Sequence, residues 1–148
     1  MRLTGIALRH KRRGQMCQLD TAAIGLRFGV KGDYRGRAGS RQVTVLSQDS
    51  WIDTCDHLNV DLPWTIRRAN LLITGKRFSR EDVGSIISIG KVELRITRET
   101  NPCHRMDDAS DGLREALDID WRGGVCCRVE QEGIIQVGMS VELSRVVL

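Results

Sequence analysis

The chain is 148 residues long, 41% of them hydrophobic, and carries a formal net charge of +4. These values suit a single globular domain spanning residues 1–148, and no apolar run approaches the roughly 20 residues that a membrane helix requires. The basic N-terminal residues precede no apolar stretch, which excludes the pattern of a signal peptide. We therefore expect a cytoplasmic protein with reduced cysteines and no membrane partner.

The basic charge is almost entirely arginine: 19 residues are Arg and four are Lys. A guanidinium group binds phosphate or carboxylate through two parallel hydrogen bonds, so this composition favours an anionic ligand. Nucleic acid is disfavoured because aromatic residues, which stack on bases, make up only 4% of the chain. The alternative is that most of these arginines are simply solvated at the surface.

The first part of the chain predicts short strands separated by loops. An alternating pattern predicts a strand over residues 2–9, a charged loop follows over 10–20, and residues 24–30 include a short extended piece. Residues 32–40 form a loop rich in glycine and arginine. This loop leads into a β-branched strand over residues 41–46.

A helix is predicted after Ser47, which is a good N-cap residue. The apolar residues of one helical face follow it, namely Trp51, Ile52, Cys55 and Leu58. The helix should end before Pro63, because the residue ahead of a proline avoids the helical conformation. We interpret Cys55 as a core residue.

Three polar residues stand just ahead of the apolar strand Leu71-Leu72-Ile73. They are Arg67, Arg68 and Asn70, and at the mouth of a strand they could serve as anion ligands. A capped loop with solvated arginines explains the same residues equally well.

The next strands, residues 85–89 and 92–97, are separated by Gly90-Lys91 and predict a tight hairpin. A helical pattern follows over residues 106–117. Its apolar positions are Met106, Ala109, Leu113, Ala116 and Leu117.

After Gly123-Gly124, residues 125–130 are expected to pair with residues 133–137 through a short turn, and residues 141–143 form a last strand. The whole pattern gives about eight to ten short strands and two helices. Many short strands with glycine turns predict a mainly β (α+β) fold, built as a barrel or a sandwich.

The most chemically suggestive segment is Asn101-Pro102-Cys103-His104-Arg105-Met106. Pro102 should end the preceding strand and place the Cys103 thiol in a turn at the start of the helical pattern. The positive end of a helix favours the thiolate, so Cys103 is a candidate metal ligand or nucleophile, and His104 could tune it. The alternative is that Cys103 is a small buried hydrophobe.

Several common site motifs are missing from the sequence. It contains no phosphate-binding P-loop, dinucleotide-binding glycine pattern, zinc-protease HExxH or hydrolase nucleophile elbow. An odd number of cysteines without a CxxC pair argues against a disulfide framework or a structural zinc site. We assign no role to Cys126 or Cys127.

Four stretches, taken in their order along the chain, resemble the MOSC domain, the module named from the C-terminal part of molybdenum cofactor sulfurase. They are Gly32-Asp33 with Gly39 ahead of Arg41–Leu46, then Arg67–Ile73 with Gly75, then Asn101–Met106, and finally Gly124–Val129 with 134–138 and 141–143. The likeness departs at Arg35, where many relatives have His, and at Ser40, where many have Asp.

The resemblance implies a closed or partly open β-barrel like the small barrel domain of pyruvate kinase, and the molybdenum cofactor (molybdopterin) as ligand. It implies that Cys103 binds molybdenum. Arg68 and Asn70, with Arg67 and more weakly Arg41, would hold the anionic pterin. Pyridoxal phosphate is not expected, because no Lys suits a Schiff base. A soft thiolate and a set of arginines agree with this ligand on chemical grounds.

Three functions stay open at this point. The first is a molybdenum-dependent oxidoreductase that reduces N-hydroxylated compounds with electrons from an external donor protein. The second is a sulfur carrier, similar to a sulfurtransferase, that holds a persulfide on Cys103 and receives sulfur from a donor protein. The third is a module without enzymatic activity whose arginine-rich face binds an anion or a partner.

Overall fold

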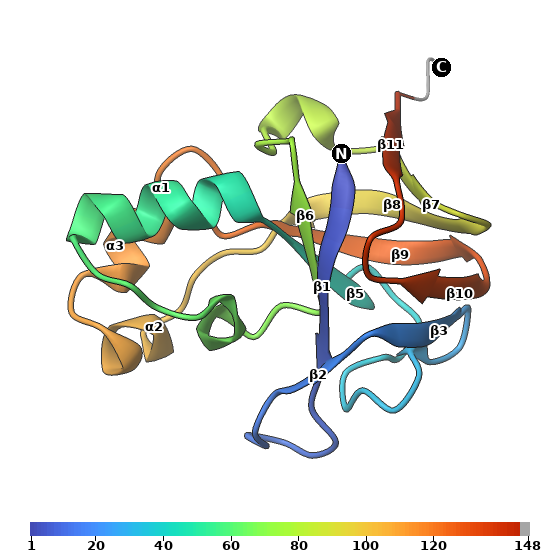
Figure 1. The fold of residues 1–148 in the computed structure, drawn as a ribbon, viewed down its shortest axis with the longest axis horizontal. Coiled ribbons are helices and arrows are strands. Elements are labelled where there is room, and N and C mark those ends of the chain that lie inside the picture. Colours follow the sequence, from blue (N-terminus) through green and yellow to red (C-terminus); the bar gives the residue numbers. More distant parts are fainter. Residues whose placement is uncertain (146–148) are drawn as a thin grey trace.

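A computed structural model describes residues 1–145 and shows two β-sheets with the α-helices gathered at one side of them (Figure 1). The strands are β1 (Arg2–Leu8), β2 (Cys17–Leu19), β3 (Thr21–Gly25), β4 (Gly29–Val30), β5 (Val43–Ser47), β6 (Leu71–Thr74), β7 (Ile86–Ile89), β8 (Val92–Glu99), β9 (Val125–Gln131), β10 (Gly133–Gln136) and β11 (Val141–Ser144). The helices are α1 (Gln48–Leu58), α2 (Arg105–Ala109) and α3 (Leu113–Leu117), with the 3-10 turns η1 (Trp64–Arg67) and η2 (Arg80–Asp82). The mainly β prediction is confirmed.

The larger sheet has eight strands in the order β11-β7-β8-β9-β5-β6-β1-β2, and only the pair β5–β6 is parallel. The ladder does not close into a barrel. A single antiparallel bridge joins Arg2 to Ser140, and the Leu3 N–H donates to the Met139 carbonyl at 2.9 Å, so the start of β1 lies against the segment before β11. A second sheet contains β10, β3 and β4.

Two sequence predictions of pairing have opposite outcomes. The hairpin β7–β8 forms as expected, with Ile89 opposite Val92 around the left-handed Gly90. The expected pairing of residues 125–130 with 133–137 is wrong, because β9 is already flanked by β5 and β8. Strand β10 instead pairs with β3 in the second sheet.

Helix α1 forms as predicted, since the Ser47 hydroxyl accepts from the Ser50 N–H at 3.1 Å and the helix ends at a left-handed Asn59. The placement of Ile52 on its apolar face is wrong, because this side chain is exposed. The helical pattern over 106–117 does not form one helix. It breaks into α2 and α3 at Gly112, whose φ of 80° lies in the left-handed region. The Asp107 carboxylate then accepts from the Arg114 N–H at the start of α3.

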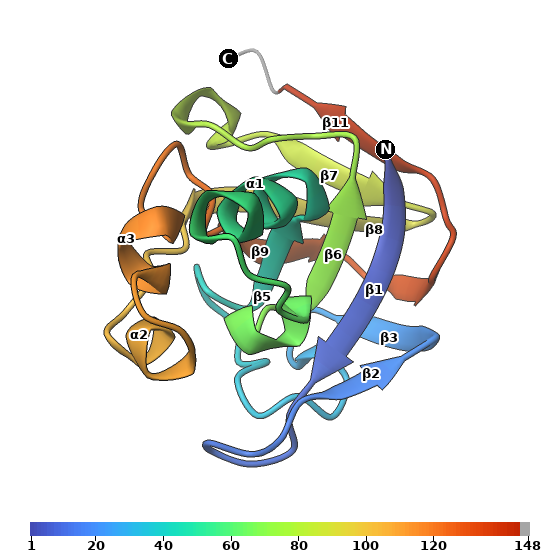
Figure 2. The same ribbon diagram turned by 60° about the vertical axis from the view of Figure 1, so that its left-hand side comes forward.

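Strands β5 and β6 separate two hydrophobic cores. Val45 and Leu71 face the core enclosed by the sheets, whereas their neighbours Leu46 and Leu72 face the core beneath the helices. Helix α1 packs against β5 and β6 (Figure 2). Because both faces are covered, Val45-Leu46 and Leu71-Leu72-Ile73 are consecutive apolar residues in the sequence. Among the described residues, no helix is long and apolar enough to cross a membrane.

Candidate functional site

A cavity of about 320 Å³ opens where the end of β1, the start of β5, the η1–β6 segment and the segment before α2 meet. This volume lies within the range of small-molecule sites. The cavity brings together every site residue that the sequence predicted, and these are Arg41, Arg67, Arg68, Asn70 and Cys103.

The cavity is strongly basic. Eight arginines line it against a single carboxylate, Asp33. The arginines are Arg9, Arg12, Arg13, Arg35, Arg41, Arg67, Arg68 and Arg105. Since the chain has 23 basic and 19 acidic residues, 15 basic and 18 acidic residues remain elsewhere, and the rest of the chain is net negative. The excess positive charge of this protein is therefore concentrated at one cavity.

None of these eight arginines forms an ion pair with a carboxylate in the described part of the chain. The ion pairs all lie elsewhere, and they join Lys76 to Asp82, Arg77 to Asp53, Arg95 to Glu130, Arg128 to Glu130, and Arg145 to Glu81. The cavity arginines are thus clustered beside one another without counter-charges, which favours the binding of an anion.

Burial, together with the clustering, changes the pKa values of these arginines. Burial and the nearby charges of Arg68 and Arg35 lower the pKa of Arg9, and burial and Arg105 lower the pKa of Arg68. Burial, helped by Arg41, lowers the pKa of Arg67 to about 10. Each shift means that the folded protein disfavours the charged form. A bound anion would relieve that cost.

Arg67 is buried and holds two chain segments together. Its Nε donates to the Gly123 carbonyl at 3.0 Å and its Nη2 to the Thr100 carbonyl at 2.9 Å. A side chain at Gly123 would collide with the Thr100 oxygen. Arg67 therefore fixes the segment that carries Cys103, and two of its donor groups are engaged by the protein itself.

Asn70 is also engaged in the wall of the cavity. Its Oδ1 accepts from the Thr44 N–H at 3.0 Å and the Thr44 hydroxyl at 3.3 Å, and its Nδ2 donates to the Ala7 carbonyl at 3.2 Å. These bonds tie β5 to β1. The side chain of Asn70 thereby sets the position of the strands that line the cavity.

Arg68 has a left-handed backbone, with φ of 64°, and its Nη2 donates to the Gly14 carbonyl at 2.6 Å. This bond anchors the loop between β1 and β2, which brings Arg12 and Arg13 to the cavity. No local pattern in the sequence indicates a site role for these two residues or for Arg9. They are distant from η1 in the sequence, and only the fold places them beside it.

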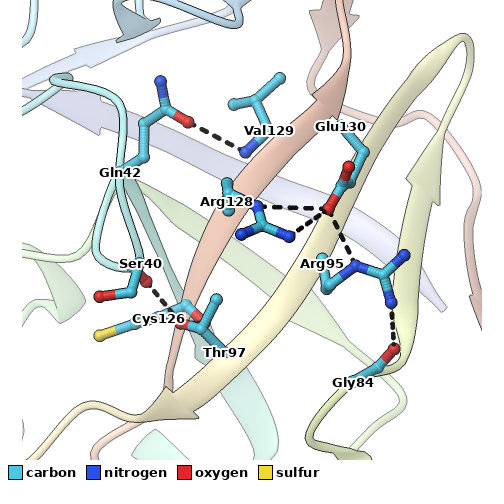
Figure 3. Close-up of polar contacts among 9 residues, drawn as sticks. All are labelled: Ser40, Gln42, Gly84, Arg95, Thr97, Cys126, Arg128, Val129 and Glu130. Atoms are coloured by element: carbon cyan, nitrogen blue, oxygen red, sulfur yellow. Dashed lines mark hydrogen bonds and ion pairs between the residues drawn. The ribbon is translucent and has the colours of Figure 1, made fainter.

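The arginine-rich loop before β5 is held by the buried side chain of Gln42. Its Nε2 donates to the carbonyls of Leu26 and Gly36, at 2.8 and 3.2 Å, while its Oε1 accepts from the Val129 N–H at 3.0 Å (Figure 3). Gly36 packs so closely on the Phe28 carbonyl that no side chain fits there. The loop is thereby fixed at the edge of the cavity.

The thiol of Cys103 is exposed and lines the cavity. It lies between β8 and α2, and its carbonyl accepts from the Met106 N–H at 3.0 Å. The strand-to-helix position predicted from the sequence is confirmed, and the alternative of a buried hydrophobe is wrong. Cys55, Cys126 and Cys127 are buried, and His104 is not among the lining residues.

Within residues 1–145, no group of three or more His, Cys, Asp or Glu side chains is placed to hold a metal ion.

Residues 8–142 match the MOSC domain family. The chain belongs to this family. MOSC domains are associated with the molybdenum cofactor, and the resemblance seen in the sequence is confirmed. No curated protein sequence matches this MOSC protein.

Solved structures share its fold. YuaD from Bacillus subtilis has a TM-score of 0.81 and 18% identity, over 99% of this chain and 96% of that chain. YiiM from Escherichia coli has a TM-score of 0.73 and 16% identity, over 99% and 71%. YiiM from Geobacillus stearothermophilus has a TM-score of 0.73 and 15% identity, over 97% and 75%.

Proposed function

We propose that the cavity binds the molybdenum cofactor with Cys103 as the protein ligand of the metal, and that the loaded protein reduces N-hydroxylated compounds. One observation carries the proposal: an exposed thiol lines a cavity that also contains eight arginines without carboxylate partners in the described part of the chain.

The residues present fit this cofactor chemically. A thiolate is a soft ligand of the kind that thiophilic metals select, and Cys103 offers one from the wall of the cavity. A pterin phosphate is an anion that guanidinium groups bind in a bidentate manner. The lack of a metal-binding cluster in the described residues agrees with a metal that arrives with its own sulfur ligands.

The cavity residues divide into two roles. Arg68 and Arg41 are proposed to contact the anionic pterin, with Asn70 at its polar ring, using the donor hydrogens that the protein leaves free. Arg67 is proposed to act mainly by holding the Cys103 segment, because its Nε and Nη2 already bind carbonyls.

When bound, the cofactor would supply a two-electron redox centre. Reduction of an N–OH group consumes two electrons and two protons and releases water, leaving N–H. The electrons must come from a separate donor protein. The chain itself binds and orients the reactants, and its apolar lining residues Val45, Ala69 and Met106 limit the access of water.

The first test is the molybdenum and pterin content of protein purified anaerobically from a host that makes the cofactor. We expect near-stoichiometric molybdenum in the wild type and at least about tenfold less in Cys103→Ser, because an alcohol is a poor ligand for a soft metal. Cys17→Ser is the matched control, since Cys17 is also exposed but does not line the cavity. Equal molybdenum in all three proteins would overturn the role of Cys103.

The reaction is tested separately with N-hydroxylated amidines and an artificial electron donor. Activity should follow molybdenum content across the variants. A loaded wild-type protein that reduces none of these compounds would leave cofactor binding intact and contradict the proposed reaction.

The exposure of Cys103 favours a second candidate, a sulfur carrier, because a donor protein can reach this thiol. Intact mass would then show one added sulfur atom that a reductant removes. The added sulfur should be absent from Cys103→Ser and present in Cys17→Ser. Its absence from the wild type after incubation with a sulfur-donating enzyme would exclude this function.

A further inference from the structure

A second hollow of about 450 Å³ opens beside the cavity, along the loop that joins β4 to β5. Its lining residues all come from that loop, and they are Tyr34, Arg35, Arg37, Ala38, Gly39, Ser40 and Arg41. Arg35 and Arg41 line both spaces. The hollow is therefore an outward extension of the cavity that contains Cys103.

The charge of this hollow is uniformly positive. It contains three arginines and no carboxylate, and none of the three pairs with an acidic residue in the described part of the chain. The other lining residues next to the arginines are small, namely Ala38, Gly39 and Ser40, and no atom lies close to the open side of Gly39. An anion can therefore approach the guanidinium groups without displacing a side chain.

Tyr34 adds an aromatic surface to this positive charge. Tyr34 is 42% exposed, and it is the only tyrosine in the sequence. The Tyr34 N–H donates to the Arg9 carbonyl at 2.8 Å, and the Arg9 guanidinium carbon lies 5.9 Å from the ring centroid. Because Arg9 lines the inner cavity, Tyr34 stands at the boundary between the two spaces.

The loop is held at several points, so the hollow exists before a ligand arrives. The Gln42 side chain donates to the carbonyl of Gly36. The Thr97 hydroxyl donates to the carbonyl of Ser40 (Figure 3). At the other end, the Asp33 carboxylate accepts from the Arg9 N–H at 3.2 Å. A preformed site binds its ligand without the cost of ordering a loop.

We propose that this hollow binds the phosphate-bearing part of a planar aromatic substrate of the nucleoside monophosphate type. Arg35 and Arg37 bind the phosphate and the ring rests on Tyr34, from which it can extend into the inner cavity, while Arg41 stays with the cofactor. The proposal rests on the proposed function and names its substrate class: N-hydroxylated aromatic compounds that carry a phosphate. The arginines deeper in the cavity remain for the cofactor.

The test measures equilibrium binding of adenosine monophosphate, adenosine and inorganic phosphate to the protein as purified from the cofactor-competent host. Adenosine monophosphate should bind at least about tenfold more tightly than either fragment, because only it engages both the arginines and the ring. Tyr34→Leu and Arg37→Gln, two residues that line only the outer hollow, should each weaken it about five- to tenfold. Arg128→Gln, outside both spaces, is the control and should change nothing.

Two results would overturn the proposal. The first is that adenosine monophosphate binds no more tightly than inorganic phosphate, which would leave a simple anion site. Alternatively, both variants could bind it as the wild type does, while an acidic polypeptide such as polyglutamate competes with it, which would make the surface a docking site for an acidic protein.

Molybdenum content measured on the same samples separates this proposal from the proposed function. Variant-sensitive binding of adenosine monophosphate without molybdenum would support the hollow and remove the cofactor function. If molybdenum content depends on Cys103 but neither Tyr34→Leu nor Arg37→Gln weakens the binding of adenosine monophosphate, the cofactor function would be supported and the proposal for the hollow removed.

Discussion

On the outer face of β8 and β9, Arg95 and Arg128 share the carboxylate of Glu130, with nitrogen–oxygen distances of 2.8 and 2.9 Å (Figure 3). In the cavity, Arg9, Arg68 and their neighbours lie close together and have no such partner in the described residues. The outer pair holds the pKa of Glu130 below its usual value, whereas the pKa values of the cavity arginines are themselves lowered.

The difference shows what an arginine count in the sequence leaves out. Surface arginines that pair with a carboxylate contribute little to stability, and their charge is balanced locally by that carboxylate. A cluster of like charges is retained against its own repulsion, and such local conflicts concentrate at functional sites. The arginines of the cavity are therefore better evidence of an anionic ligand than the total charge of the chain.

The largest expected effect comes from Arg67→Met, which removes the donor that holds the cavity together. The carbonyls of Thr100 and Gly123 would stay buried without a partner, so we expect the free energy of unfolding to fall by roughly 3 kcal/mol. Urea denaturation measures it. Arg128→Met is the control, with an expected loss within about 0.5 kcal/mol; equal losses would mean that Arg67 has no special structural role.

Gln42→Leu should have the next largest effect. It removes the bonds to Leu26 and Gly36 and leaves the Val129 N–H unpaired, at a cost of about 2 kcal/mol. Because the same bonds hold the arginine-rich loop, limited proteolysis should cleave within residues 32–41 faster than in the wild type. Unchanged proteolysis would show that the loop is held by other contacts.

Inorganic phosphate should stabilise the protein through the cavity. At a concentration about ten times its dissociation constant, the gain is about 1.4 kcal/mol. Thermal unfolding in phosphate and in chloride at equal ionic strength measures this gain. An Arg9→Gln/Arg68→Gln protein should lose most of it, and an Arg95→Gln/Arg128→Gln protein should retain it. A gain that survives in the first protein would place the anion elsewhere.

The smallest effect is expected for Glu130→Gln, below about 1 kcal/mol, because the pair is solvated and screened by salt. The ion pairs lower the pKa of Glu130 in the folded state, so their stabilisation is present above the unfolded pKa and is lost as the pH falls through the folded one. The wild type and the variant should therefore converge in stability at low pH. A constant difference at all pH values would contradict the ionic origin.

Much of this architecture could be predicted from local patterns. The cap at Ser47, the turn at Gly90 and the position of Cys103 between a strand and a helix each depend on a few adjacent residues. The pairing of β10 with β3 could not be predicted, because it depends on β5 and β8 having occupied both edges of β9. The break between α2 and α3 could not be predicted either, because hydrophobic periodicity does not reveal the left-handed backbone of Gly112.

The site shows the same division. Arg67, Arg68 and Asn70 were found because they are adjacent in the sequence, as part of a family resemblance. Arg9, Arg12 and Arg13, far from these residues in the sequence, carry no local signal and reach the cavity only through the fold. The sequence also gave no means to distinguish an arginine that binds backbone carbonyls, such as Arg67, from one whose donors remain available.

The most direct test of the account compares cofactor content in two matched double variants. Arg9→Gln/Arg68→Gln and Arg95→Gln/Arg128→Gln each remove two positive charges, the first inside the cavity and the second outside it. We predict that the cavity variant contains at least about tenfold less pterin and molybdenum than the wild type. The outer variant should keep the wild-type content. Equal retention by both variants would contradict the claim that the unpaired arginines of the cavity bind the cofactor.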